Sequence, residues 1–281
     1  MLDPKLIRNE PDRVKEGARA KNVARADVDR WLELDESRRA LLARVESLKA
    51  DRNAASKSIG QIMKSGGDAA AEKERVRVMG EEISGLDEQV RTVDAELGEL
   101  GDWFPNLPHD SVPRGDESAN QTVATWGDPV RHPFPAKQHD ELGQALGWLE
   151  FGAAYHMSGS GFTVFRRRGA RLERALMQFF LDVHTTEHGY TEVSTPFMVK
   201  DHALRGTGQL PKLADDMYRT EPDGFWLIPT AEVSITNIHA DADPIPEEDL
   251  TVKYVGYSPC FRREAGAYGK DTRGMFRVHQ F

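Results

Sequence analysis

Residues 260–281 read CFRREAGAYGKDTRGMFRVHQF, and no other stretch of the sequence carries as much information. It joins a Phe-Arg-x-Glu sequence at residues 261–264 to a loop rich in glycine and basic residues, and it ends on Arg277 and the aromatic Phe281. Guanidinium groups bind phosphate through paired hydrogen bonds, and aromatic rings stack on nucleotide bases. These residue types therefore predict a strand and loop that bind ATP.

The composition limits what kind of protein this is. With 281 residues and 39% hydrophobic residues, the chain is long enough for two domains. The single cysteine, Cys260, excludes an internal disulfide and a multi-cysteine zinc site. No apolar run approaches the roughly 20 residues of a membrane helix, and no signal peptide follows Met1, so a cytoplasmic location without membrane association is expected. A net charge of −9 argues against a protein that coats nucleic acid but allows a local basic patch.

The N-terminal third predicts a helical hairpin. Two series of apolar or small residues repeat at alternating spacings of three and four, and only Arg52 interrupts them. The Gly-rich turn at residues 65–68 separates them, which predicts antiparallel helices. The first helix, from about residue 27 to 64, would be about 55 Å long. The series comprise Leu41, Val45, Leu48, Ala55, Ile59 and Ile62, then Val76, Met79, Ile83, Leu86, Val90, Val93, Leu97, Leu100 and Phe104.

Such a rod has little surface for a catalytic pocket, and heptads alone favour a dimerisation or spacer coiled coil. The charges near the turn favour RNA binding instead, because four basic residues face only Asp51 among the acids. A solvated helix face is the alternative explanation for these charges. The candidate RNA-binding residues are Lys49, Arg52, Lys57 and Lys64.

Proline-rich sequence marks the end of this arm. We divide the chain into a helical arm at residues 1–104, a connector at 105–118 and a second domain at 119–281. In the second domain, residues 169–187 predict an amphipathic helix that leads into a strand before Pro196. His184 and His188 lie four residues apart, but we reject a zinc site because further ligands and a general base are lacking. No metal ligand is assigned.

Residues 260–281 closely resemble the second signature motif of class II aminoacyl-tRNA synthetases, in the form found in the seryl-tRNA synthetase family. Further similar segments cover nearly the whole chain; they are residues 169–176, 206–212, 229–232 and 254–260. The resemblance implies an α+β fold, in which an antiparallel two-helix coiled-coil arm precedes a class II antiparallel sheet domain flanked by helices. It also implies that the helix and strand between residues 169 and 196 lie in a homodimer interface.

The resemblance implies a role for each candidate site residue. Arg262 matches the catalytic arginine that bridges the ATP α-phosphate and the carboxylate of serine. Glu264 matches the residue that binds the adenine amino group, and Phe281 matches the aromatic residue that stacks on the base. Arg263, between Arg262 and Glu264, is also assigned as an ATP ligand. Serine binding is implied for Thr230, Ala231 and Glu232. Without the resemblance, Thr230 reads as a helix cap, Phe281 as a core residue, and Glu264 as a partner for Arg273 or Lys270.

The implied activity is serine-tRNA ligation. Serine and ATP form seryl-adenylate with Mg²⁺ present, and the seryl group passes to tRNA-Ser, with tRNA-Sec as an additional acceptor. The arm would bind tRNA by shape, and Lys270 and Arg273 would follow its acceptor end. Two alternatives stay open. One is a non-catalytic tRNA-binding paralogue. The other is a synthetase-like protein that charges a carrier protein, but such proteins usually lack the long arm.

Members of the family continue past the His-Gln-Phe sequence with further serine ligands, metal ligands and a third motif. From this difference we expect the 281 residues to be the N-terminal piece of a longer synthetase, inactive when alone. Serine-dependent pyrophosphate exchange by the 281-residue chain would contradict that expectation.

Overall fold

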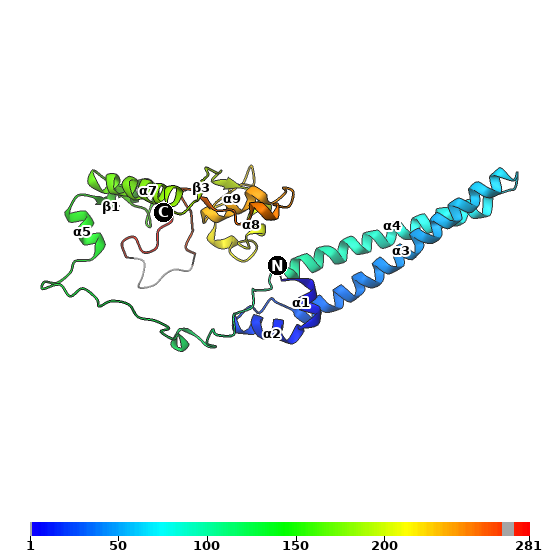
Figure 1. Cartoon of the computed structure of the whole chain (residues 1–281), viewed down its shortest axis with the longest axis horizontal. Helices are drawn as coiled ribbons and strands as arrows, with labels where there is room; N and C mark the ends of the chain where they lie inside the picture. The colour runs from blue at the N-terminus through cyan, green and yellow to red at the C-terminus, as the bar shows by residue number, and fades with distance from the viewer. Residues whose placement is uncertain (1, 266–272) are drawn as a thin grey trace. The chain divides into compact units, whose positions relative to one another are not determined.

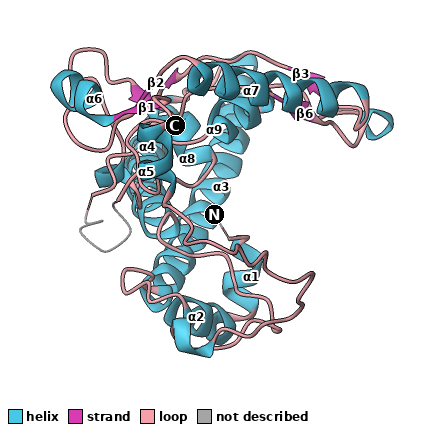
Figure 2. Ribbon diagram, turned by 90° about the vertical axis from the view of Figure 1, so that its left-hand side faces the viewer, coloured by secondary structure: helices cyan, strands magenta, loops and turns pink. Residues whose placement is uncertain are grey.

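The computed structural model describes residues 2–265 and 273–281. The chain divides into two compact units, Met1–Thr125 and Trp126–Phe281. The described residues form helices and short strands, which confirms the predicted α+β class (Figure 2). Among these residues, no helix is long and apolar enough to cross a membrane.

The first unit is a helical hairpin with two short helices at its base. Helix α3 begins at the cap residue Asp27, whose carboxylate accepts a hydrogen bond from Arg30 N at 3.0 Å. It ends at the predicted Gly-rich turn, where Gly66 has a φ of 76° that favours glycine. The helices of this unit are α1 (Pro4–Asn9), α2 (Pro11–Ala20), α3 (Val28–Lys64) and α4 (Ala70–Gly101). Figure 1 shows α3 and α4 side by side, as the heptads predict.

The predicted seams are the buried faces of this hairpin. Val45 and Leu48 of α3 pack in one cluster with Ile83 of α4, and all three are at most 4% exposed. Ala55 continues the buried seam toward the turn. The side chain of Arg52 interrupts the series and is only half-buried. The period of apolar residues therefore identified the contact face correctly.

Ion pairs cross the hairpin along its exposed edges. Arg30 pairs with Glu96 at 3.2 Å, Arg38 pairs with Asp94, and Arg44 pairs with Glu82 at 2.8 Å. Lys49 also pairs with a residue of α4, Asp87, at 3.5 Å. The prediction that the cations near the turn face only Asp51 is therefore wrong for Lys49. That prediction considered each helix separately, whereas the acidic partner of Lys49 comes from the second helix, α4.

The base of the arm has its own hydrophobic core. Trp31 of α3 is 4% exposed, and its ring lies 6.4 Å from that of Phe104, at a tilt of 55°. Helices α1 and α2 contribute Ile7 and Val14 to the same cluster. Gly17 allows α2 to approach the segment after α4, because a Cβ atom there would come within 2.5 Å of Leu107. The short N-terminal helices therefore brace the base of the hairpin.

Trp31→Ala is expected to destabilise the first unit by about 3–5 kcal/mol, because it leaves a large cavity beside Phe104. Chemical unfolding followed by circular dichroism would measure the loss. Val78→Ala, at an α4 side chain that is 48% exposed, is the control and should change the stability by less than about 1 kcal/mol. Equal losses in the two variants would contradict a core at the base.

The second unit contains short strands and helices. Its strands are β1 (Leu149–Glu150), β2 (Val164–Phe165), β3 (Thr191–Glu192), β4 (Met198–Val199), β5 (Trp226–Leu227) and β6 (Tyr254–Val255). Its α-helices are α5 (His139–Ala145), α6 (Phe151–Ser158), α7 (Arg168–Thr186), α8 (Asp201–Gly206) and α9 (Ala231–Thr236). Strand β1 pairs with β2 and β4 with β5 in antiparallel orientation, whereas β3 and β6 are parallel.

Single backbone hydrogen bonds extend the β4–β5 pair toward the end of the chain. Phe261 N donates to Ile228 O at 2.9 Å, directly after β5. On its other side, Phe261 forms an antiparallel bridge with Gln280. Residues 261–264 were expected to form a strand, but the pairing with residues 279–281 ends at Arg262, whose N donates to His279 O at 3.0 Å. Arg263 N donates instead to Asp216 O at 2.6 Å, and Glu264 has a φ of 50°, so the extended backbone ends there.

Helix α7 has the predicted amphipathic pattern, but its apolar face is open. Helix α7 packs against β3 and β6. The large side chains of its apolar face nevertheless remain unburied. Four of its large apolar side chains are 45–58% exposed: Leu172, Leu176, Phe179 and Phe180.

Candidate functional site

A pocket of 370 Å³ in the second unit lies where the end of β5 meets residues 261–264. A volume of about 300–1,000 Å³ is typical of small-molecule sites. Three of the predicted site residues line this pocket together: Thr230, Arg262 and Glu264. The other lining residues are Gln209, Leu213, Asp216, Met217 and Pro229.

Arg262 is held at the edge of this pocket from two sides. Its Nε donates to the carbonyl oxygen of Pro229 at 3.2 Å, and its guanidinium lies over the Phe281 ring, 4.7 Å from the centroid. Its backbone N donates to His279 O at 3.0 Å. Among the described residues the Nη1 and Nη2 groups have no hydrogen-bond partner. A guanidinium anchored in this way presents two donors to an anion.

The residues predicted to bind serine lie at the beginning of α9. Thr230 is the cap of this helix, and its hydroxyl accepts a hydrogen bond from Glu232 N at 3.4 Å. Thr230 thus has the capping role that its sequence context suggests, and it also lines the pocket. Glu232 is exposed in the first turn, and Ala231 is half-buried before it. Neither of these two residues lines the pocket.

Glu264 and Phe281 lie on different sides of Arg262. Glu264 lines the pocket and accepts a hydrogen bond from Arg277 Nη1 at 3.2 Å. The partner of Glu264 is therefore Arg277 and not Arg273 among the described residues. Phe281 lines a neighbouring pocket, with one face of its ring covered by the Arg262 guanidinium. A base that stacks on Phe281 must use the other face or displace the guanidinium.

Arg263 points away from the residues on either side of it. Its Nη1 donates to Asp215 O at 3.1 Å, and its side chain lines a separate pocket of 490 Å³ with Tyr218, Arg219 and Trp226. Side chains alternate along an extended backbone, which places Arg262 and Arg263 on opposite faces. The structure does not bring Arg263 together with the other predicted ATP ligands.

Sequence reasoning missed two residues that line this pocket, Asp216 and Gln209, and the contact between Arg277 and Glu264. Asp216 lines the pocket, and its carboxylate accepts a hydrogen bond from Ala265 N at 2.9 Å. Gln209 belongs to a segment similar to the synthetase family, which was a usable signal. Arg277 reaches Glu264 across 13 residues. The sequence singles out Arg277 but not its contact with Glu264, and no local pattern singles out Asp216.

The predicted RNA-binding cations have different surroundings. Within the described part of the chain, Arg52, Lys57 and Lys64 form no ion pair, whereas Lys49 pairs with Asp87. Arg273 pairs with Asp140 at 2.9 Å and with Glu141 at 2.8 Å. Its hydrogen bond to Asp140 lowers the pKa of that carboxyl, which therefore stays ionised at neutral pH. Lys270 lies outside the described residues.

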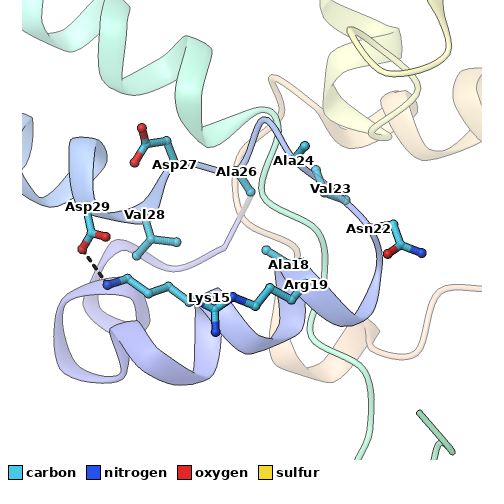
Figure 3. Close-up of a pocket in the computed structure, with 10 residues that line it drawn as sticks. All are labelled: Lys15, Ala18, Arg19, Asn22, Val23, Ala24, Ala26, Asp27, Val28 and Asp29. Atoms are coloured by element: carbon cyan, nitrogen blue, oxygen red, sulfur yellow. Dashed lines mark ion pairs between the residues drawn. The ribbon is translucent and has the colours of Figure 1, made fainter. Parts of the chain in front are cut away.

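A second pocket, of 680 Å³, belongs to the base of the arm and contains none of the predicted site residues. It lies between α2 and the beginning of α3 (Figure 3). Its charged residues include Lys15 and Asp29, which pair with each other at 2.6 Å. Since these two charges already neutralise each other, we do not assign a reaction to this pocket.

The described residues offer no cluster of metal ligands. The described chain contains no group of three or more His, Cys, Asp or Glu side chains placed to hold a metal ion. His184 and His188 face each other, with their Nδ1 atoms 3.0 Å apart. The ring of Tyr190 also lies beside His184, with the centroids 5.3 Å apart. The two histidine rings thus contact each other, and His184 also contacts Tyr190.

Comparisons with known proteins agree with this architecture. The family model for the seryl-tRNA synthetase N-terminal domain matches residues 1–108, and the model for the class II tRNA synthetase core domain (G, H, P, S and T) matches residues 216–281. The crystal structure of seryl-tRNA synthetase from Pyrococcus horikoshii complexed with ATP matches with a TM-score of 0.88 and 33% identity. The match covers 100% of this chain and 68% of that one.

Curated relatives match over the whole chain as well. The serine–tRNA ligase of Solibacter usitatus is 46% identical over 282 residues, and the enzyme of Methylacidiphilum infernorum is 44% identical over 283 residues. Each match covers 100% of this chain, which spans 66% and 67% of the length of these two relatives. The chain belongs to the seryl-tRNA synthetase family of class II aminoacyl-tRNA synthetases.

Proposed function

We propose that the protein activates serine with ATP and transfers the seryl group to tRNA-Ser for translation, with tRNA-Sec as a further acceptor. The observation that carries this proposal is the convergence of Thr230, Arg262 and Glu264 on one pocket. The structural neighbour from Pyrococcus horikoshii contains ATP, and that from Naegleria fowleri contains AMP. We also propose a cytoplasmic location, because a role in translation requires it.

The reaction has two steps and needs no protein nucleophile. A carboxylate oxygen of serine attacks the α-phosphorus of ATP, the bond to the bridging oxygen of the β-phosphate breaks, and pyrophosphate leaves. A hydroxyl of the 3′-terminal ribose then attacks the carbonyl carbon of seryl-adenylate, and AMP leaves. The protein lowers the barrier by orienting the reactants and by neutralising phosphate charge.

Each site residue has a part in this scheme. The Nη1 and Nη2 groups of Arg262 bind the α-phosphate and the serine carboxylate, because the Pro229 carbonyl and the Phe281 ring already hold the rest of the side chain. Glu264 accepts a hydrogen bond from the adenine amino group. Glu232 binds the ammonium group of serine and Thr230 its hydroxyl, with Ala231 between them at the start of α9. Arg263 makes no contact with ATP in this scheme, because its side chain lines a different pocket.

Mg²⁺ belongs to the proposal only as the counterion of ATP. The described residues contain no group of three or more His, Cys, Asp or Glu side chains that could hold it. Arg262 is the cation that the chain itself supplies at this pocket.

Pyrophosphate exchange tests the proposal. It would be measured on a longer protein in which these 281 residues are followed by a segment that corresponds to the remaining third of the relatives. We call this protein the extended chain. We expect exchange to require serine and ATP, with alanine failing because it leaves the hydroxyl-binding groups unpaired. An extended chain that binds tRNA-Ser but shows no exchange would instead support a non-catalytic tRNA-binding protein.

We also infer that the arm binds tRNA-Ser and that Arg52, Lys57 and Lys64 contact its phosphates. These three cations have no ion pair among the described residues, so phosphate binding would not have to displace a carboxylate. Lys49 must first leave Asp87, and we expect it to contribute less. An arm with scattered cations suits A-form RNA, which proteins read largely through shape and phosphates.

We propose a homodimer that covers the exposed face of α7. Apolar side chains that are 45–58% exposed on one helix face are typical of an interaction surface. Phe179→Asp combined with Phe180→Asp should convert the extended chain from dimer to monomer in sedimentation equilibrium, raising the dissociation constant by at least about 100-fold. Val78→Asp, on the exposed side of α4, is the control. A variant that stays dimeric would place the interface elsewhere.

A further inference from the structure

A set of contacts that we call the α5 clasp joins helix α5 to the segment after the Gly-rich loop. Arg273 Nε donates to Asp140 at 2.9 Å, and Arg273 Nη2 donates to Glu141 at 2.8 Å. Met275 N donates to His139 Nε2 at 2.9 Å. Some 133 residues of chain separate Arg273 from Asp140. The clasp therefore fixes the segment 273–276 onto a distant part of the same unit.

The packing around the clasp is close. The backbone at Gly274 has a φ of 65°, and a Cβ atom there would lie 2.2 Å from His139 Nε2. The Phe276 ring meets the His139 ring edge-on, with 4.8 Å between the centroids. Asp140 is only 8% exposed, so its charge depends on Arg273 for neutralisation. Any residue larger than glycine at position 274 would separate the two sides.

The clasp continues directly into the proposed ATP pocket. Arg277 follows the clasped segment and donates to Glu264 at 3.2 Å. His279 N then donates to Gly161 O at 2.8 Å, and its carbonyl oxygen accepts from Arg262 N at 3.0 Å. Glu264 lines the pocket. The position of the segment 273–276 therefore determines where Arg277 holds the Glu264 carboxylate.

The same contacts argue against Arg273 as an RNA ligand. Its guanidinium is paired with two carboxylates, so the local charge of the three side chains is −1. A tRNA phosphate would have to displace both carboxylates and would leave the buried Asp140 unpaired. Cations without a partner are better placed to bind phosphate.

We propose that His139, Asp140 and Arg273 are positioning residues for ATP, which hold the segment 273–276 so that Arg277 orients Glu264 in the pocket. The inference rests on the proposed function and deepens it, since none of the three residues touches ATP itself. Loss of the clasp should weaken ATP binding and leave serine binding and tRNA binding unchanged.

The test uses the extended chain and two readouts: equilibrium binding of ATP by calorimetry, and the KM values in pyrophosphate exchange. Asp140→Ala and Arg273→Ala should each raise the Kd and the KM for ATP by about tenfold, with the KM for serine unchanged. The double variant should be no worse than either single one, because both remove the same interaction. Gly274→Ala should give a similar loss by displacing His139.

Glu141→Ala is the matched control, because this carboxylate is 51% exposed and pairs with the same guanidinium. Its expected effect on the KM for ATP is at most about twofold. If Asp140→Ala does not fold, Asp140→Asn keeps the shape of the side chain and removes its charge, and Arg273→Met keeps the apolar part of the arginine side chain without its guanidinium.

Two results would overturn the inference. One is an unchanged Kd for ATP in the folded clasp variants. The other is a selective effect of Arg273→Ala on tRNA-Ser, with the slope of log K against log salt reduced by about 0.7–0.9, which would make Arg273 a phosphate ligand. If the unmodified extended chain binds ATP but shows no serine-dependent exchange, the proposed function fails, while the ATP-binding data still test the clasp.

Discussion

Arg262→Ala is expected to lower kcat/KM for serine-dependent pyrophosphate exchange by about 10³-fold, because it removes the cation that we propose binds both reacting groups. Such a loss corresponds to about 4 kcal/mol of transition-state stabilisation. The guanidinium is anchored by the Pro229 carbonyl oxygen and the Phe281 ring, so neighbouring side chains cannot replace it. Arg262→Lys keeps the charge but loses the planar pair of donors, and we expect an intermediate loss of about 10²-fold.

Arg263→Ala is the matched control for this experiment. The two arginines are adjacent in sequence, but Arg263 donates to Asp215 O and lines a different pocket. Its replacement should change exchange by less than about threefold, as expected of a surface position outside the site. Equal losses in the two variants would refute the assignment of Arg262 and favour a general requirement for positive charge.

Removal of the outer hairpin should separate the two steps of the reaction. In this variant, residues 45–81 are replaced by a short Gly-Ser turn, which keeps the Arg44–Glu82 ion pair and the core around Trp31. We expect the KM for tRNA-Ser in aminoacylation to rise by about 10²-fold or more, because several phosphate contacts are lost together. Pyrophosphate exchange without tRNA should stay unchanged, since no residue that lines the proposed ATP pocket comes from the arm.

Point variants refine this prediction. Lys57→Gln combined with Lys64→Gln should reduce the slope of log K against log salt by about 0.7–0.9 for each phosphate contact that is lost. The control is Arg77→Gln, at a cation of α4 that is already paired with Glu74 at 2.6 Å. If the hairpin deletion leaves the KM for tRNA-Ser unchanged, the arm is a spacer or dimerisation element.

Much of the arm follows from the sequence alone. The alternating spacing of apolar residues predicts which face of each helix is buried, and the structure confirms this at Val45, Leu48 and Ile83. The turn before α4 and the start of α3 also lie where they were predicted. Helical periodicity is a local property, so a single segment contains all the information that is needed. The partner of Lys49 was missed because Asp87 comes from the other helix.

In the second unit, the sequence determined which residue types gather at the site, and the tertiary structure decided their neighbours. The family resemblance placed Thr230, Arg262 and Glu264 at one site, and the structure brings these three together. Only the folded chain shows that Arg263 faces the other way, that Arg277 binds Glu264 and that α5 holds Arg273. These contacts join residues up to 133 positions apart, and no local pattern encodes such a distance. For α7, periodicity identified the apolar face, while its exposure depends on which other parts of the protein reach it.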